Sequence, residues 1–140
     1  MKHNAIVTVA RLRRLARDEA HQVLLCALAT EAAAIARADD ATRRIADETA
    51  AASSITGDDA MVDAFAAWLP GARQHAINTR AACERAGAEV GRTRAILTVS
   101  RTAAEAVETL LAQRAAAAAK DYARRFQAEL DEVGRGTGLR

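Results

Sequence analysis

The chain has 140 residues, near the size of one ordinary domain, and 38 of them are Ala, 18 are Arg and only 2 are Lys. One Pro, seven Gly and four aromatic residues argue against a β-sandwich, a barrel or a doubly wound α/β fold. Twenty basic and 18 acidic residues nearly cancel to +2, which disfavours nucleic acid as a partner. The residues in excess are strong helix formers, so the composition predicts an all-α protein.

The first predicted helix runs over about 4–52 and is followed by a loop at about 53–58. Gly57 suits a left-handed cap, and Asp58 or Asp59 suits the N-cap of the next helix. The large apolar residues of this helix are Val9, Leu12, Leu15, Val23, Leu24, Leu28, Ile35 and Ile45. From Leu28 to Ile35 and Ile45 the steps are 7 and 10 residues, which fit one helical face.

The second predicted helix runs over about 59–133 and precedes a flexible tail at 134–140. Its residues follow alternating steps of four and three, a spacing typical of a left-handed coiled coil. The series is Phe65, Leu69, Ala72, Ala76, Thr79, Cys83, Ala86, Val90, Thr93, Leu97, Ser100, Ala104, Val107, Leu111, Arg114 and Ala118. The apolar phase then shifts to Tyr122, Phe126, Leu130 and Val133.

Two long helices joined by a short loop predict one elongated antiparallel two-helix coiled-coil hairpin over 1–140. Small Ala side chains at core positions would let the two axes come close. The second helix is the longer one and extends past the first from about Gln113. Pro70 allows a kink in it, and a turn at Pro70–Gly71 is the alternative position for the apex. Cys26 and Cys83 are expected at about the same level, both within the core.

The chemistry of an enzyme is missing from the pattern. His3, His21 and His75 lack metal-ligand spacing, and the sequence has no phosphate-binding loop and no nucleophile motif. A thin hairpin offers no pocket to desolvate its carboxylate pairs. We therefore expect a protein that is not an enzyme, with no cofactor and no metal. No signal peptide and no membrane-spanning stretch are visible, so we expect no membrane insertion and a cytoplasmic location.

Two clusters stand out as candidate binding surfaces. Basic residues gather near both ends of the chain, at Arg11, Arg13, Arg14, Arg17, Lys120, Arg124 and Arg125. Apolar bulk gathers near the loop, at Ile55, Met61, Val62, Phe65, Trp68 and Leu69, which is more than a two-helix tip can easily bury. The first cluster favours an acidic partner, and the second favours a protein partner.

These features resemble the stalk family of type III secretion ATPases (FliJ/YscO-like). The resemblance covers nearly the whole chain and includes three short patterns. These are Leu12-x-x-Leu15, Phe65-x-x-x-Leu69-x-x-Ala72, and the segment from Phe126 to Glu132. The Ala/Arg-rich composition and the Trp68-Leu69-Pro70 step favour the injectisome or Hrp-type branch over the flagellar one, while Pro70 departs from an uninterrupted second helix.

The resemblance implies a central stalk that is not itself an enzyme. The end with the termini would enter a hexameric secretion ATPase, and the opposite region would contact the cytoplasmic domain of the export gate. Some family members also hold secretion chaperones. The gate-binding stripe would fall on Phe65, Leu69, Ala72 and Ala76, with Trp68 beside it; the last family position is often His, and here His75 precedes Ala76.

The resemblance further implies a monomer when isolated, located in the cytoplasm at the periphery of the inner-membrane secretion apparatus. On physical grounds we assign the basic residues to the contact with the ATPase ring, because an Arg-rich end inside an acidic ring gains steering and register.

The main alternative is a coiled-coil assembly factor or secretion chaperone that self-associates through its Ala-rich core. A secreted helical hairpin of the WXG type is a weaker alternative, because two residues separate Trp68 from Gly71 and the arms are too long. A basic helical nucleic-acid binder is also weaker, given four aromatic residues and a near-neutral charge.

Overall fold

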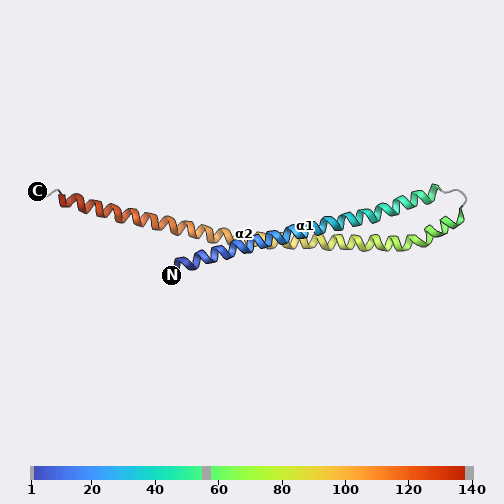
Figure 1. Cartoon of the computed structure of the whole chain (residues 1–140), viewed down its shortest axis with the longest axis horizontal. Helices are drawn as coiled ribbons and strands as arrows, with labels where there is room; N and C mark the ends of the chain where they lie inside the picture. Colours follow the sequence, from blue (N-terminus) through green and yellow to red (C-terminus); the bar gives the residue numbers. More distant parts are fainter. Residues whose placement is uncertain (1, 55–57, 138–140) are drawn as a thin grey trace. The chain divides into compact units, whose positions relative to one another are not determined.

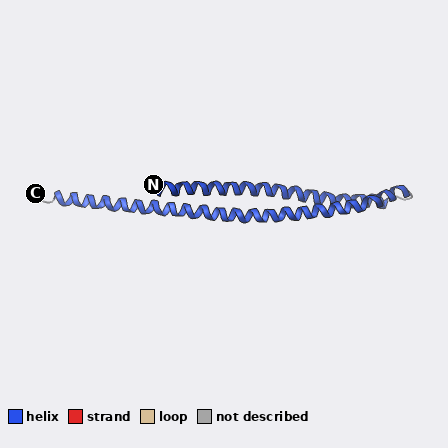
Figure 2. Ribbon diagram, turned by 90° about the horizontal axis from the view of Figure 1, so that it is seen from below, coloured by secondary structure: helices blue, strands red, loops and turns tan. Residues whose placement is uncertain are grey.

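The computed structural model describes residues 2–54 and 58–137, and all of them except Asp58 are helical. Helix α1 spans Lys2–Ser54 and helix α2 spans Asp59–Thr137 (Figure 1). The two helices pack against each other (Figure 2), which confirms the predicted all-α helical hairpin. Each helix extends beyond its predicted bounds of about 4–52 and 59–133.

The chain divides into two compact units. The first, here called the loop unit, comprises Glu19–Thr98. The second, here called the terminal unit, comprises Met1–Asp18 and Val99–Arg140. Each unit therefore contains a stretch of α1 and a stretch of α2, and each is described below by itself.

The face of α2 that packs against α1 follows the predicted spacing. In the loop unit every predicted position from Phe65 to Leu97 is buried or half-buried, and Val90, Thr93 and Leu97 are nearly inaccessible. In the terminal unit the same holds for Ser100, Ala104, Val107 and Leu111, whereas Arg114 and Ala118 are exposed. The prediction is thus confirmed from Phe65 to Leu111 and wrong for its last two positions, where α1 no longer covers α2.

The packing face of α1 is rich in alanine, as was expected for the core positions, and Leu24 and Ile45 are half-buried on it. Buried Ala20, Ala34 and Ala41 belong to the loop unit and buried Ala10 to the terminal unit. Twelve positions of α1 follow the same alternating spacing and are buried or half-buried. They are Ile6, Ala10, Arg17, Ala20, Leu24, Ala27, Glu31, Ala34, Ala38, Ala41, Ile45 and Ala52. Together with the α2 series these residues form what we call the seam.

Of the three large residues predicted to share one face of α1, Leu28 and Ile45 are half-buried, whereas Ile35 is exposed. Val9, Leu12, Leu15 and Val23 are exposed as well. A methyl side chain lets two helix backbones approach closely, and the larger side chains are then directed away from the contact. Cys26 is also exposed while Cys83 is half-buried, so the expectation that both cysteines lie in the core is wrong for Cys26.

The chain reverses between Ser54 and Asp59. The Asp58 carbonyl accepts a hydrogen bond from the Val62 amide at 3.3 Å, which makes Asp58 the N-cap residue of α2. The capping role predicted for Gly57 lies outside the described residues, as does Ile55 of the apolar cluster. Helix α2 continues through Pro70 and Gly71, so the alternative apex at that position is not what the chain adopts.

In the terminal unit α2 extends past the stretch that α1 covers, as Figure 2 shows. Every side chain from Ala112 to Gly136 is exposed, and we call residues 112–136 the overhang. Its start agrees with the predicted one near Gln113. The tail predicted to be flexible from Gly134 is helical as far as Thr137, and Arg135 in the last turn favours this because a cation there opposes the helix dipole.

Leu97 and Ile96 provide a matched pair of adjacent side chains in α2. Leu97 is 4% exposed and Ile96 is 51% exposed. We expect Leu97→Ala to lower the free energy of unfolding by about 2 kcal/mol, since it opens a cavity in the seam. Ile96→Ala should change it by less than about 0.5 kcal/mol. Urea unfolding followed by circular dichroism measures both, and equal losses would contradict the assignment of the seam.

Gly91 and Gly87 provide a second matched pair. A Cβ at Gly91 would meet nothing within 4 Å, whereas one at Gly87 would lie 3.2 Å from Oε1 of Glu31. Replacing a helical glycine by alanine gains about 1 kcal/mol of stability. We expect that full gain for Gly91→Ala and a smaller one for Gly87→Ala, where the Glu31 carboxylate must shift. A larger gain at Gly87 in thermal unfolding would refute the close approach.

Candidate functional site

The basic residues of α1 that were predicted to bind a partner lie in the terminal unit. Arg11 and Arg13 are exposed. Arg14 donates from Nε to Oε1 of Glu108 on α2 at 2.7 Å, and Arg17 binds Oδ1 of its neighbour Asp18 at 2.8 Å. The Arg14–Glu108 pair joins α1 to α2, but half of each side chain stays in water, so it contributes at most about 1 kcal/mol. Arg14 can therefore exchange Glu108 for an acidic partner at little cost.

The basic residues of the overhang are Lys120, Arg124 and Arg125, and all three are exposed. Nη2 of Arg124 lies 3.8 Å from Oδ1 of Asp121. Because this contact is long and exposed to solvent, it does not fix the Arg124 side chain. Acidic residues follow directly, at Glu129, Asp131 and Glu132, and these are exposed as well. From Lys120 to Arg125 the overhang carries three basic residues and one acidic residue, and from Glu129 to Glu132 it carries three acidic residues.

The two basic groups share one unit but do not converge on one pocket. The Arg11–Arg17 group lies on α1, where α2 runs beside it. The Lys120–Arg125 group lies on the overhang, beyond the covered stretch (Figure 2). A partner that contacts both groups must therefore reach along the terminal unit.

The predicted gate-binding stripe lies in the loop unit. Phe65, Trp68, Leu69, Ala72 and Ala76 are all half-buried. They do share one side of α2, but that side is turned toward α1, because four of them belong to the seam. The rings of Phe65 and Trp68 lie 5.9 Å apart at an angle of 37°. The surface offered to a partner here is the edge of the helix pair, with exposed Met61 and Val62 next to it.

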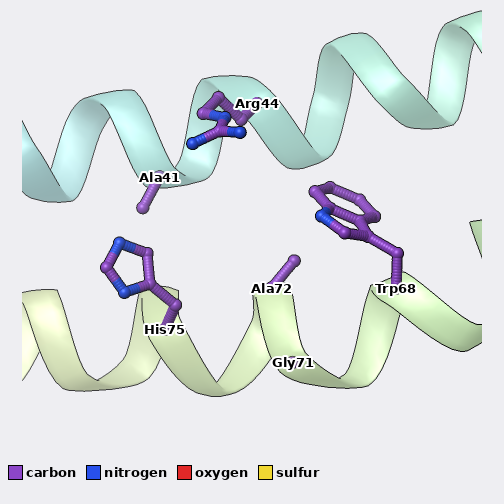
Figure 3. A pocket seen from close by; sticks show the side chains of 6 residues that line it. All are labelled: Ala41, Arg44, Trp68, Gly71, Ala72 and His75. Carbon is purple, nitrogen blue, oxygen red and sulfur yellow. The ribbon is translucent and has the colours of Figure 1, made fainter.

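A shallow groove crosses this edge. It is lined by Ala41 and Arg44 of α1 and by Trp68, Gly71, Ala72 and His75 of α2. Figure 3 shows Arg44 on one side of the groove, facing the Trp68 and His75 side chains on the other. The groove combines an aromatic wall, a cation and an imidazole at the surface of the helix pair. That combination suits recognition of a peptide or a side chain rather than catalysis.

The sequence analysis missed four exposed apolar side chains in the terminal unit. Leu12 and Leu15 lie on α1 and Val99 and Leu110 lie on α2, on the sides of the two helices that do not face the seam. Their positions do not match the seam spacing that includes Ala10 and Ala104. Because they lie on the outer sides of two different helices, they form no single patch, and each helix offers its own candidate contact.

The described residues offer no other chemistry that would change this interpretation. No group of three or more His, Cys, Asp or Glu side chains among them could hold a metal ion. Within the same ranges, neither helix has a stretch apolar and long enough to cross a bilayer.

Comparisons with protein-family models, with curated proteins and with solved structures gave no match. The resemblance to the secretion stalk family therefore depends on the residues and the geometry described above.

Trp68 is the largest side chain of the groove edge, and its contacts predict a measurable contribution to stability. We expect Trp68→Ala to lower the free energy of unfolding by about 1–2 kcal/mol, because the half-buried ring loses its contact with Phe65. Ile77→Ala is the control, since Ile77 is 60% exposed and should matter little. Urea unfolding by far-ultraviolet circular dichroism compares the two, and an equal effect would place the Trp68 ring outside the packing.

Proposed function

We propose that this protein is a non-enzymatic central stalk of a type III protein secretion system. It would insert into the hexameric secretion ATPase, link the ring to the export gate, and regulate ATP hydrolysis and protein export. It would act in the cytoplasm, at the periphery of the inner-membrane secretion apparatus. The observation that carries the proposal is the overhang, a single fully exposed helix that continues from a helical hairpin.

The overhang has the shape that a central stalk requires. In this proposal the pore of the ATPase ring admits one or two helices, and residues 112–136 present one helix with short Ala side chains at 115–119. Exposed Lys120, Arg124 and Arg125 lie on that helix, and exposed Arg11 and Arg13 lie on α1 in the same unit. Arginine binds carboxylates bidentately, so an acidic ring would gain orientation and faster association from these side chains.

The loop unit supplies the second contact in this proposal. The groove edge formed by Phe65, Trp68 and Leu69 would meet the cytoplasmic domain of the export gate or a secretion chaperone. Because the stripe is half-buried in the seam, the partner would contact its outer edge together with Met61 and Val62. Ala72 and Ala76 then act by keeping the two helices close, rather than by touching the partner.

A second candidate function is favoured by the exposed apolar residues of the terminal unit. Leu12, Leu15, Val99 and Leu110 suit a coiled-coil assembly factor or secretion chaperone that packs against further helices. Such a protein would bind client helices without changing ATP hydrolysis, and this difference separates the two functions.

Charge reversal in the α1 cluster tests the stalk function. We expect Arg13→Glu combined with Arg14→Glu to weaken association with the hexameric secretion ATPase encoded in the same genome by roughly tenfold or more, and to reduce the stimulation of its hydrolysis. Pull-down binding curves and a phosphate-release assay measure the two effects.

Two controls accompany this experiment. Arg37→Glu with Arg43→Glu reverses two exposed charges in the loop unit, outside the groove, and should leave ATPase stimulation unchanged. Glu108→Gln removes the partner of Arg14 without reversing a charge, so it isolates the effect of the ion pair on stability. Unchanged binding and unchanged stimulation in the Arg13/Arg14 variant would reject the assignment.

A further inference from the structure

The overhang carries an apolar stripe that continues the seam side of α2. Tyr122, Phe126, Leu130 and Val133 are 72%, 53%, 50% and 65% exposed. At about 100° per residue, these side chains lie within an arc of about 80° on the helix surface. Leu111, which is half-buried against α1, and Ala115 lie in the same direction. The face that α1 covers up to Leu111 therefore continues, with larger side chains, along the exposed helix.

The charges beside this stripe change sign along the helix. One edge of the stripe carries Asp121 and Arg125 before its middle and Glu129 and Glu132 after it. Arg124 and Asp131 lie on the opposite side of the helix, away from the stripe. When two copies run in opposite directions, this edge meets itself, and Arg125 of each copy lies near the acidic part of the other.

We propose that two copies of this chain pair antiparallel through their overhangs, and that the stripe is the surface they share. In this alignment Tyr122 of one copy lies level with Val133 of the other, and Phe126 lies level with Glu129–Leu130. The same alignment sets Arg125 beside Glu132 of the second copy, twice by symmetry. Antiparallel coiled coils bring equivalent flanking positions together in this way, so the apolar and the ionic contacts form in one register.

The aromatic pair supports the same contact. The rings of Tyr122 and Phe126 stack with centroids 6.5 Å apart and planes within 10°, which gives the stripe a flat, ordered start. Two such surfaces related by a twofold axis can pack over Leu130 and Val133 of the opposite copy. In a parallel pair the edge that carries Arg125 and Glu132 would face the opposite edge of the second copy, so these two residues would not meet. The pairing concerns the isolated chain and does not depend on the proposed function, although it replaces the predicted isolated monomer.

The test measures the mass of the full-length chain by light scattering over a range of concentrations. We expect the wild type to rise reversibly from 14.8 kDa toward double that mass. Arg125→Glu alone and Glu132→Arg alone should each weaken the dimer at least tenfold, because each places like charges together twice. A mixture of these two variants should dimerise again, since every contact in the mixed pair then joins opposite charges.

Matched controls define the surface. Arg124→Glu and Asp131→Arg make the same charge changes on the opposite side of the overhang and should leave dimerisation unchanged. Phe126→Ser should abolish it. Far-ultraviolet circular dichroism checks that each variant remains helical, and because the altered positions lie outside the stretch covered by α1, the hairpin is expected to persist.

Disulfide trapping determines the direction. In a chain with Cys26→Ala and Cys83→Ala, a mixture of Tyr122→Cys and Val133→Cys chains should cross-link between the two variants. Tyr122→Cys chains alone should cross-link poorly. A chain that is monomeric at all concentrations, a dimer that tolerates Phe126→Ser, or efficient cross-linking of Tyr122→Cys to itself would each overturn the proposal.

Discussion

The close approach of two alanine-lined helix faces is the constraint on which this protein depends. Ala10, Ala20, Ala34 and Ala41 are buried on α1, and Ala104 is buried on α2. Each such residue removes little apolar surface from water, so the helix pair gains less per residue than one with leucine at every core position. In exchange the backbones come close, and larger side chains such as Leu12 and Ile77 are left on the outside.

This arrangement explains why the candidate functional surfaces are where they are. A seam that uses methyl groups leaves the bulky apolar residues available for partners, on the groove edge of the loop unit and on the outer faces of the terminal unit. The overhang is also available to partners, because no part of the described chain packs against α2 there. The stalk proposal and the pairing proposal both use this segment, so a ring and a second copy would compete for the same helix.

The all-α class, the number of helices and the side of α2 that packs could be predicted from the sequence, because the residues that indicate them differ clearly in type from the rest of the chain. Val90, Leu97 and Leu111 recur at multiples of seven residues, and the 3.5-residue spacing follows from them. The packing face of α1 could not be predicted in this way. Alanine occurs on every side of α1, so a buried Ala34 and an exposed Ala33 look the same in the sequence.

The candidate sites show the same division. The start of the overhang followed from the unequal helix lengths, and all of the basic residues near both ends except half-buried Arg17 are exposed. The half-burial of Leu69, Ala72 and Ala76 could have been foreseen, because the same residues belong to the predicted coiled-coil series. Their two roles conflict, since one side of a helix cannot both face α1 and be fully open to a partner.

The contact between Gly87 and Glu31 has a consequence for how the two helices choose their alignment. A seam in which alanine repeats every seven residues presents nearly the same surface after a slip of two helical turns, so many alignments have similar energy. Gly87 is the point where the Glu31 carboxylate would lie only 3.2 Å from an added Cβ. A slip of seven residues would instead set Arg80 or Arg94 opposite Glu31. Of these three alignments, the native one alone places Glu31 against a position that has no side chain.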